Sequence, residues 1–209
     1  MIDDQDSRSP GVKGSSEKNL LYKLKVQHNI MKNRLHTEYV LLGSLFEGPK
    51  HGYEIMNFLD SALQSTWQVS SSQLYVVLKR LESQGLLKCS LKTQKTRPAK
   101  RVFTLTPAGK KGFLEWLRNP VEHVRDLRIE FIAKLFFFQR LSVKGGEDLI
   151  KIQIESLEEL KGKFKKGRDK ENDPFKKLVF GIKIITIEGW LKWLIKQTTP
   201  FMRKVYSHG

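Results

Sequence analysis

The chain has 209 residues, with 38 Lys and Arg against 22 Asp and Glu, and therefore a formal net charge of +16. Hydrophobic residues make up 39% and charged residues 29%, a composition that excludes a wholly disordered chain. The single cysteine, Cys89, excludes a disulfide framework and a cysteine-based zinc site.

The sequence gives no sign of a membrane span or a secretory signal. The most apolar stretch, residues 178–195, carries Lys183, Glu188 and Lys192, which are costly in the centre of a bilayer. The first ten residues have no apolar core. We therefore expect a cytoplasmic protein with no membrane partner and, from its charge, an anionic partner.

Residues 1–36 predict a flexible basic arm, because they are rich in Ser, Gly and Lys and lack a clear hydrophobic period. Helices are predicted over residues 37–47, where Gly48-Pro49 follows, and over residues 51–63. The second of these helices has apolar or aromatic residues at near-helical spacing: Tyr53, Ile55, Met56, Leu59 and Leu63.

A third helix is predicted from a serine cap at residues 70–72 to about Gln84, where Gly85 ends it. Steps of about 100° per residue place one group of apolar residues on a single face: Leu74, Val77, Leu78 and Leu81. The opposite face, flanked by Tyr75 and Arg80, carries Ser72, Val76, Lys79 and Ser83. One face is suited to packing, and the other to phosphates and base edges.

Two short strands, residues 86–93 and 100–104, are predicted around a turn at residues 95–98, and a helix follows from Thr106-Pro107. A run of basic residues without an acidic one spans this hairpin: Lys88, Lys92, Lys95, Arg97, Lys100 and Arg101. Three helices followed by a basic hairpin is the order of a winged helix-turn-helix. We therefore expect residues 37–118 to be a DNA-binding domain.

This segment contains three distinctive motifs. They read EGPKHGYEI at residues 47–55, QLY, LKRLE and GLL between residues 73 and 87, and RVFTLTPAG at residues 101–109. Together these motifs resemble the PadR family of transcriptional regulators. The family usually has a Gly near Ser72 and a Pro at Val76, and this chain departs from it at both positions. The resemblance implies a dimeric DNA-binding repressor with a helical C-terminal region.

The residues and the resemblance together give a set of expected contacts with double-stranded DNA. From the third helix these are Ser72, Gln73, Tyr75, Lys79 and Arg80. From the start of the second helix they are His51 and Tyr53, and from the wing Lys95, Arg97, Lys100 and Arg101.

Residues 119–209 predict a helical dimerisation domain. A near-heptad stripe runs through Val124, Leu127, Phe131, Leu135 and Phe138. Residues 175–195 are apolar on nearly all sides, so this helix is expected to be buried. Because such broad faces exceed what one subunit can cover, we expect a homodimer through residues 121–197. The expected fold is thus mainly α with a small β-hairpin wing.

No residue pattern predicts catalysis, a cofactor or a metal site. The five histidines show no metal-binding spacing, and no glycine-rich phosphate loop is present. His51 is expected to cap or pack a helix. We therefore expect no enzyme activity.

A small aromatic effector is a further expectation. Trp190 and Trp193 share a helix face, and in the PadR-like arrangement an aromatic cavity would lie between the C-terminal helices and the winged domain. Two other functions stay open: a sequence-independent architectural nucleic-acid-binding protein, which the even spread of charge favours, and a basic helical scaffold that binds protein partners.

Overall fold

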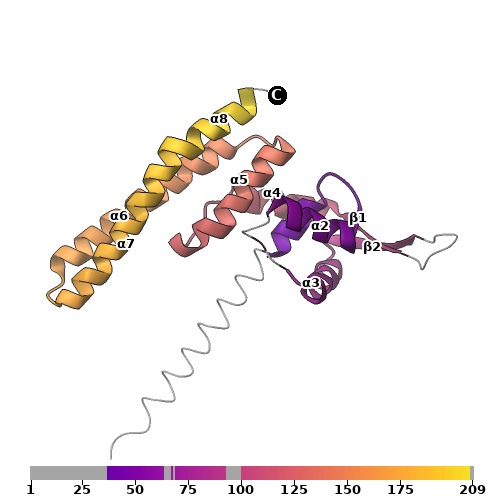
Figure 1. The fold of residues 1–209 in the computed structure, drawn as a ribbon, viewed down its shortest axis with the longest axis horizontal. Helices are drawn as coiled ribbons and strands as arrows, with labels where there is room; N and C mark the ends of the chain where they lie inside the picture. Colours follow the sequence, from indigo (N-terminus) through magenta and orange to yellow (C-terminus); the bar gives the residue numbers. More distant parts are fainter. Residues whose placement is uncertain (1–36, 64–66, 68, 93–99, 208–209) are drawn as a thin grey trace, which may run out of the picture. The chain divides into compact units, whose positions relative to one another are not determined.

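The computed structural model describes residues 37–63, 67, 69–92 and 100–207 (Figure 1). The predicted arm of residues 1–36 and the predicted wing residues Lys95 and Arg97 lie outside this part. The N-terminal half begins with a helix whose described residues are 37–44. It continues with β1 (Lys50–His51), α2 (Gly52–Ala62), α3 (Ser71–Ser83), β2 (Leu87–Lys92), β3 (Lys100–Leu105) and α4 (Pro107–Arg118).

Side-chain caps fix where these helices begin. Ser70 caps α3, and its Oγ accepts a hydrogen bond from the backbone N–H of Gln73 (3.3 Å), as the serine cluster predicts. Thr106 caps α4, with Pro107 at the first position. At the end of α3, Gly85 adopts a left-handed φ of 72°, which allows Leu86 N–H to bond to the carbonyl of Leu81. The predicted bounds of α3 are confirmed within a residue.

The sheet has three antiparallel strands in the order β1-β3-β2, so the predicted two-stranded hairpin gains a short third strand. Lys50 and His51 pair with Phe103 and Val102 of β3. Strand β1 was not predicted, because a strand of only two residues is too short to show an alternating pattern in the sequence.

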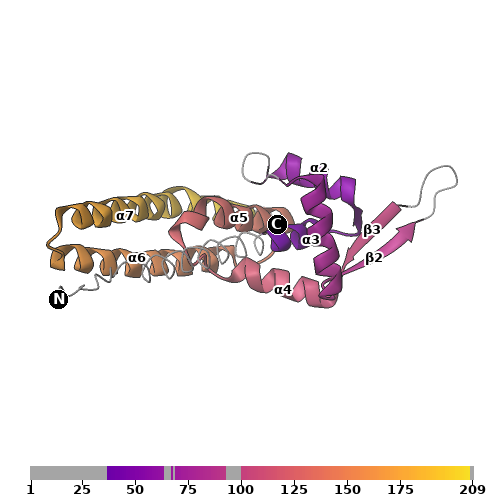
Figure 2. The same ribbon diagram turned by 90° about the horizontal axis from the view of Figure 1, so that it is seen from below.

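The elements described in the C-terminal half are all helices or helical turns. A 3₁₀ turn (Val124–Asp126) and a π-helical turn (Leu127–Phe131) lead directly into α5 (Ile132–Leu141). Helices α6 (Gly146–Lys170) and α7 (Pro174–Trp193) run side by side (Figures 1 and 2), and a second π-helical turn (Leu194–Thr198) leads into α8 (Thr199–Ser207). The expected fold class, mainly α with a winged helix-turn-helix, is confirmed.

Helix α5 completes the core of the winged helix. The ring of Phe137 lies 5.2 Å from that of Phe113 in α4 and 6.3 Å from that of Phe58 in α2. A methyl group on Gly43 would lie only 2.5 Å from Phe137, so glycine permits the close approach of α5. Residues 38–209 form one compact unit by their contacts. The division between residues 118 and 119 therefore remains a functional prediction.

The expectation that α7 is buried on all sides is wrong for the single chain. Only Ile184, Ile187 and Leu191 are buried on this helix. Four apolar residues of α7 are at least 60% exposed: Phe175, Leu178, Ile182 and Ile185.

In the described part of the chain, no helix combines the length and the apolar character that crossing a membrane requires.

Candidate nucleic-acid interface

Helix α3 presents a firmly held outward face. Its inward residues are buried as predicted, and they pack into the main core: Leu74, Val77, Leu78 and Leu81. Ser72, Gln73 and Lys79 are exposed, and Val76 between them is 66% exposed. An α-helix with such a face fits the major groove of B-DNA, where short polar and basic side chains reach base edges and phosphates.

Two of the expected contact residues on α3 also hold the helix in place. The Gln73 side chain accepts a hydrogen bond from the backbone N–H of Ser70 (3.2 Å), completing a reciprocal cap. Arg80 turns back and forms an ion pair with Glu38, a nearly buried carboxylate of the first helix. Arg80 thereby ties α3 to the helix of residues 37–44, a role that the sequence did not indicate.

The start of α2 lies against α3. Tyr75, which is 46% exposed, packs over Gly52, and a methyl group on Gly52 would overlap the Tyr75 hydroxyl. His51 caps α2 as predicted, since its Nδ1 accepts a hydrogen bond from the backbone N–H of Glu54 (3.2 Å). Tyr53, the other expected DNA contact at the start of α2, points away from the core and is 70% exposed.

The wing concentrates positive charge where β2 ends and β3 begins. Lys92 of β2 is the cross-strand partner of Lys100 in β3, and Arg101 is paired with Leu91. Like charges directly opposite each other destabilise a sheet unless an anion lies between or beside them. No acidic residue occurs between residues 88 and 101 to supply that anion. The wing is therefore suited to a phosphate backbone. Lys92, which the sequence placed in the basic run but not among the expected DNA contacts, lies directly opposite Lys100.

Comparison with known proteins identifies the family. Residues 41–115 match the Transcriptional regulator PadR-like family. The negative transcriptional regulator PadR of Bacillus subtilis is 33% identical over 136 residues, which are 62% of this chain and 73% of that protein. The chain belongs to the PadR-like family of transcriptional regulators.

Two further similarities extend the comparison. A probable transcriptional regulator of Mycobacterium tuberculosis is 25% identical over 87 residues, covering 42% of this chain and 46% of that protein. The crystal structure of Bacillus subtilis PadR in complex with operator DNA shares 24% identity with this chain, at a TM-score of 0.41. That comparison covers 81% of this chain and 98% of the other.

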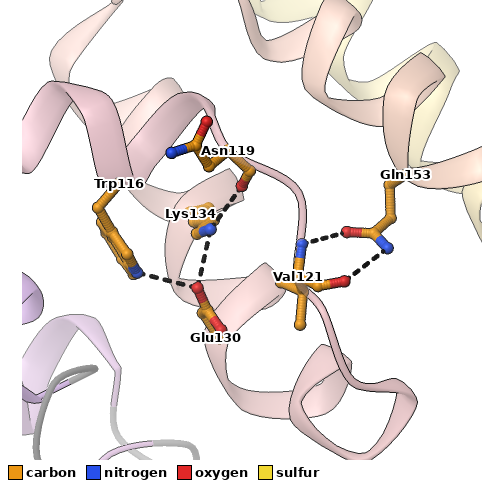
Figure 3. A network of polar contacts seen from close by, with 6 residues as sticks. All are labelled: Trp116, Asn119, Val121, Glu130, Lys134 and Gln153. Atoms are coloured by element: carbon orange, nitrogen blue, oxygen red, sulfur yellow. Dashed lines mark hydrogen bonds and ion pairs between the residues drawn. The ribbon is translucent and has the colours of Figure 1, made fainter. Parts of the chain in front are cut away.

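A buried polar network in this PadR-like regulator joins α4 to the C-terminal helices (Figure 3). Lys134 of α5 is 1% exposed and donates to Glu130 Oε1 (2.8 Å) and to the carbonyl of Asn119 (2.6 Å). Trp116 Nε1 donates to the same Glu130 oxygen (2.9 Å). Burial lowers the pKa of Lys134, and the neighbouring Glu130 carboxylate opposes that shift.

The link between α4 and α5 is also held by α6. The Gln153 side chain, which is buried, pairs with both backbone groups of Val121: its Oε1 accepts from the N–H (2.6 Å) and its Nε2 donates to the carbonyl (3.1 Å). Gln153 thereby ties α6 to the chain that follows α4.

A cavity of about 630 Å³ opens beside α5. It is lined by Ser61, Ala62 and Leu63 near the end of α2, by Ile132, Leu135, Phe136 and Gln139 of α5, and by Trp193, Gln197, Thr198 and Phe201. Trp193 thus lines the cavity. Trp190 does not, and instead packs edge-to-face on Trp193 with ring centroids 5.5 Å apart.

The described residues contain no cluster of three or more His, Cys, Asp and Glu side chains that could hold a metal ion. Cys89 is half-buried in β2 and pairs with Phe103 of β3, at the edge of the core.

Proposed function

We propose that this regulator is a DNA-binding repressor that acts as a homodimer on an inverted-repeat operator in the cytoplasm and has no catalytic activity. The observation that carries the proposal is the outward face of α3, held by caps and core packing beside a wing whose Lys92, Lys100 and Arg101 have no acidic neighbour in sequence. The Bacillus subtilis relative, a negative regulator studied with operator DNA, supports it.

The deciding experiment is selection of bound duplexes from a random pool, followed by footprinting. A dimeric repressor is expected to select a short inverted repeat with half-sites one helical turn apart, about 34 Å. An architectural protein would protect DNA without a shared sequence. Failure to bind any duplex at low salt would favour the scaffold function instead.

Lys79→Ala and Lys100→Ala are expected to weaken binding to specific and random duplexes by similar factors. Each change removes a cation placed to neutralise a phosphate, so the slope of log affinity against log salt should become shallower by about 0.9 per variant. Lys144→Ala, in the exposed connection before α6, is the matched control and should leave the slope unchanged. Unaltered slopes in both test variants would contradict the assignment of α3 and the wing.

We propose the exposed stripe of α7 as the centre of the dimer interface. At about 100° per residue, this stripe lies roughly 180° from the face that Ile184, Ile187 and Leu191 bury. Its members recur at steps of three, four and three: Phe175, Leu178, Ile182 and Ile185. That spacing is a coiled-coil seam and lies within the predicted interface of residues 121–197.

The proposed effector is a small, flat aromatic compound that binds the cavity beside α5. Apolar walls with a few amide and hydroxyl groups, here Gln139, Gln197 and Thr198, are typical of small-molecule sites. Helix α5 also carries Lys134 of the buried polar network that joins it to α4. A ligand that favours one position of α5 can therefore favour one position of α4 and of the DNA-binding half. A preference of about 1.4 kcal/mol between the two states changes occupancy tenfold.

Trp193→Leu is expected to weaken binding of an active aromatic compound by about tenfold, because it removes the ring that lines the cavity. Trp190→Leu, the matched control, should have a much smaller effect. Phenolic and cationic aromatic compounds would be screened by calorimetry, and release of operator DNA followed in parallel. Unchanged binding in Trp193→Leu would exclude Trp193 from the binding site.

A further inference from the structure

The centre of the outward face of α3 is apolar. Val76 is 66% exposed, with Ser72 one turn before it and Lys79 one turn after it. In angle it lies almost opposite the buried residues of this helix, so no part of the core can receive it. A β-branched residue is also a poorer helix former than alanine, and burial does not offset that disadvantage here.

The neighbouring aromatic residue cannot take the same role. Tyr75 is held over Gly52 at the start of α2, so its ring packs between two helices. Val76 is thus the most exposed apolar side chain of α3, and it lies between a hydroxyl and an ammonium group.

The major groove offers one apolar group on its base edges, the 5-methyl of thymine. We propose that Val76 packs on this methyl group and so specifies a T·A pair at one position in each half-site of the operator. This inference rests on the proposed DNA binding by α3. Ser72 and Lys79 would then contact polar groups on either side, while Val76 reads the base.

The test removes the methyl group alone. In the operator obtained by selection, each thymine of one half-site is replaced in turn by deoxyuridine, and the affinity of the full-length protein is measured. We expect one position at which deoxyuridine weakens binding about fourfold, the effect of withdrawing one buried methyl group. In Val76→Ala, the same replacement should change affinity less than twofold.

Two controls separate base reading from a general role of the helix. Ser83→Ala alters the last turn of the same face and should keep the deoxyuridine effect of the parent protein. Val76→Ala should keep the parental salt slope, because Val76 contacts no phosphate. Alanine favours the helix, so this variant is expected to fold.

The possible results are distinct. Loss of the deoxyuridine effect in Val76→Ala alone supports the inference. Three results would overturn the inference while leaving the proposed DNA binding intact. The deoxyuridine effect could be unchanged in Val76→Ala, no deoxyuridine position could weaken binding by the parent protein, or the selected operator could lack a thymine where α3 binds. If no duplex is bound, the proposed function fails and the inference fails with it.

Discussion

The double variant Ile182→Glu, Ile185→Glu is expected to be monomeric and to bind an inverted-repeat operator about 100-fold more weakly, or worse. Both side chains project from the exposed stripe of α7, at 60% and 65% exposure, so carboxylates there do not disturb the packing within one subunit. In a dimer they would lie in an apolar seam, where unpaired charges are strongly unfavourable. Without the second subunit, the advantage of binding two linked half-sites is lost.

Sedimentation measures the mass of the variant. The ratio of its affinities for the full operator and for one half-site measures the advantage of binding two linked half-sites. Lys177→Glu is a stringent control, because it changes charge by two units on the same helix but away from the stripe. It should remain dimeric. A double variant that sediments as a dimer would contradict the α7 interface.

Substitution is preferable here to removing the C-terminal half. A chain ending at Arg118 would lose Phe137, whose ring contacts Phe113 and Trp116 of α4 and Phe58 of α2. Such a fragment would expose its own core, and its failure to bind DNA would say nothing about dimerisation.

The sequence predicts α3 well because the signals for that helix are local. Ser70 and Gly85 mark its two ends through backbone hydrogen bonds, and its buried face follows directly from the helical period. Strand β1 depends on pairing with β3, about 50 residues away along the chain, and no local pattern encodes it.

For α7, the sequence predicts that apolar residues need burial but not which surface buries them. One face packs on α6, and the other remains exposed in the single chain. Hydropathy alone does not distinguish the face of α7 that packs on α6 from the face that stays exposed.

The buried polar network that joins α4 to the C-terminal helices was not predicted, because its charged residues have the sequence spacing of surface residues. Glu130 and Lys134 are one turn apart, the spacing of an exposed helical ion pair. The π-helical turn at Leu127–Phe131 adds a residue to one turn and shifts the register, and Glu130 is buried there beside Trp116.

Glu130→Ala is expected to lower the free energy of unfolding by about 3–5 kcal/mol, because it leaves the Lys134 ammonium buried without its ion-pair partner. Urea unfolding at a fixed protein concentration, followed by helical circular dichroism, measures the loss. Glu115→Ala is the matched control: Glu115 pairs with Lys111 at the same helical spacing in α4, but on the exposed surface (4.0 Å). Its effect should stay below about 0.5 kcal/mol.

Replacing both members of the buried pair distinguishes loss of an interaction from an uncompensated charge. Glu130→Leu with Lys134→Met removes both charges and keeps apolar volume. Its loss of stability is expected to be smaller than that of Glu130→Ala, since burying neither charge avoids the desolvation penalty. A loss equal to the sum of the two single changes would show that packing, and not charge, dominates at this site.

The pH dependence of Glu130→Ala provides a separate test of the same charge. Burial lowers the pKa of Lys134 below 10.5, so between the folded pKa and 10.5 the unfolded chain binds more protons than the folded one. Stability therefore rises with pH across that interval.

Glu130 opposes the shift, so its removal should lower the pKa of Lys134 further and extend the interval towards neutral pH. Glu130→Ala should thus recover part of its lost stability as the pH is raised, whereas Glu130→Leu with Lys134→Met should not. Tyr39 and Tyr206, whose pKa values burial raises, act in the opposite direction. Because Glu130 also raises the pKa of Tyr39, the difference to compare is that between Glu130→Ala and the double variant, both of which lack Glu130. A stability loss in Glu130→Ala that is the same at every pH would mean that Lys134 is not the charge left uncompensated.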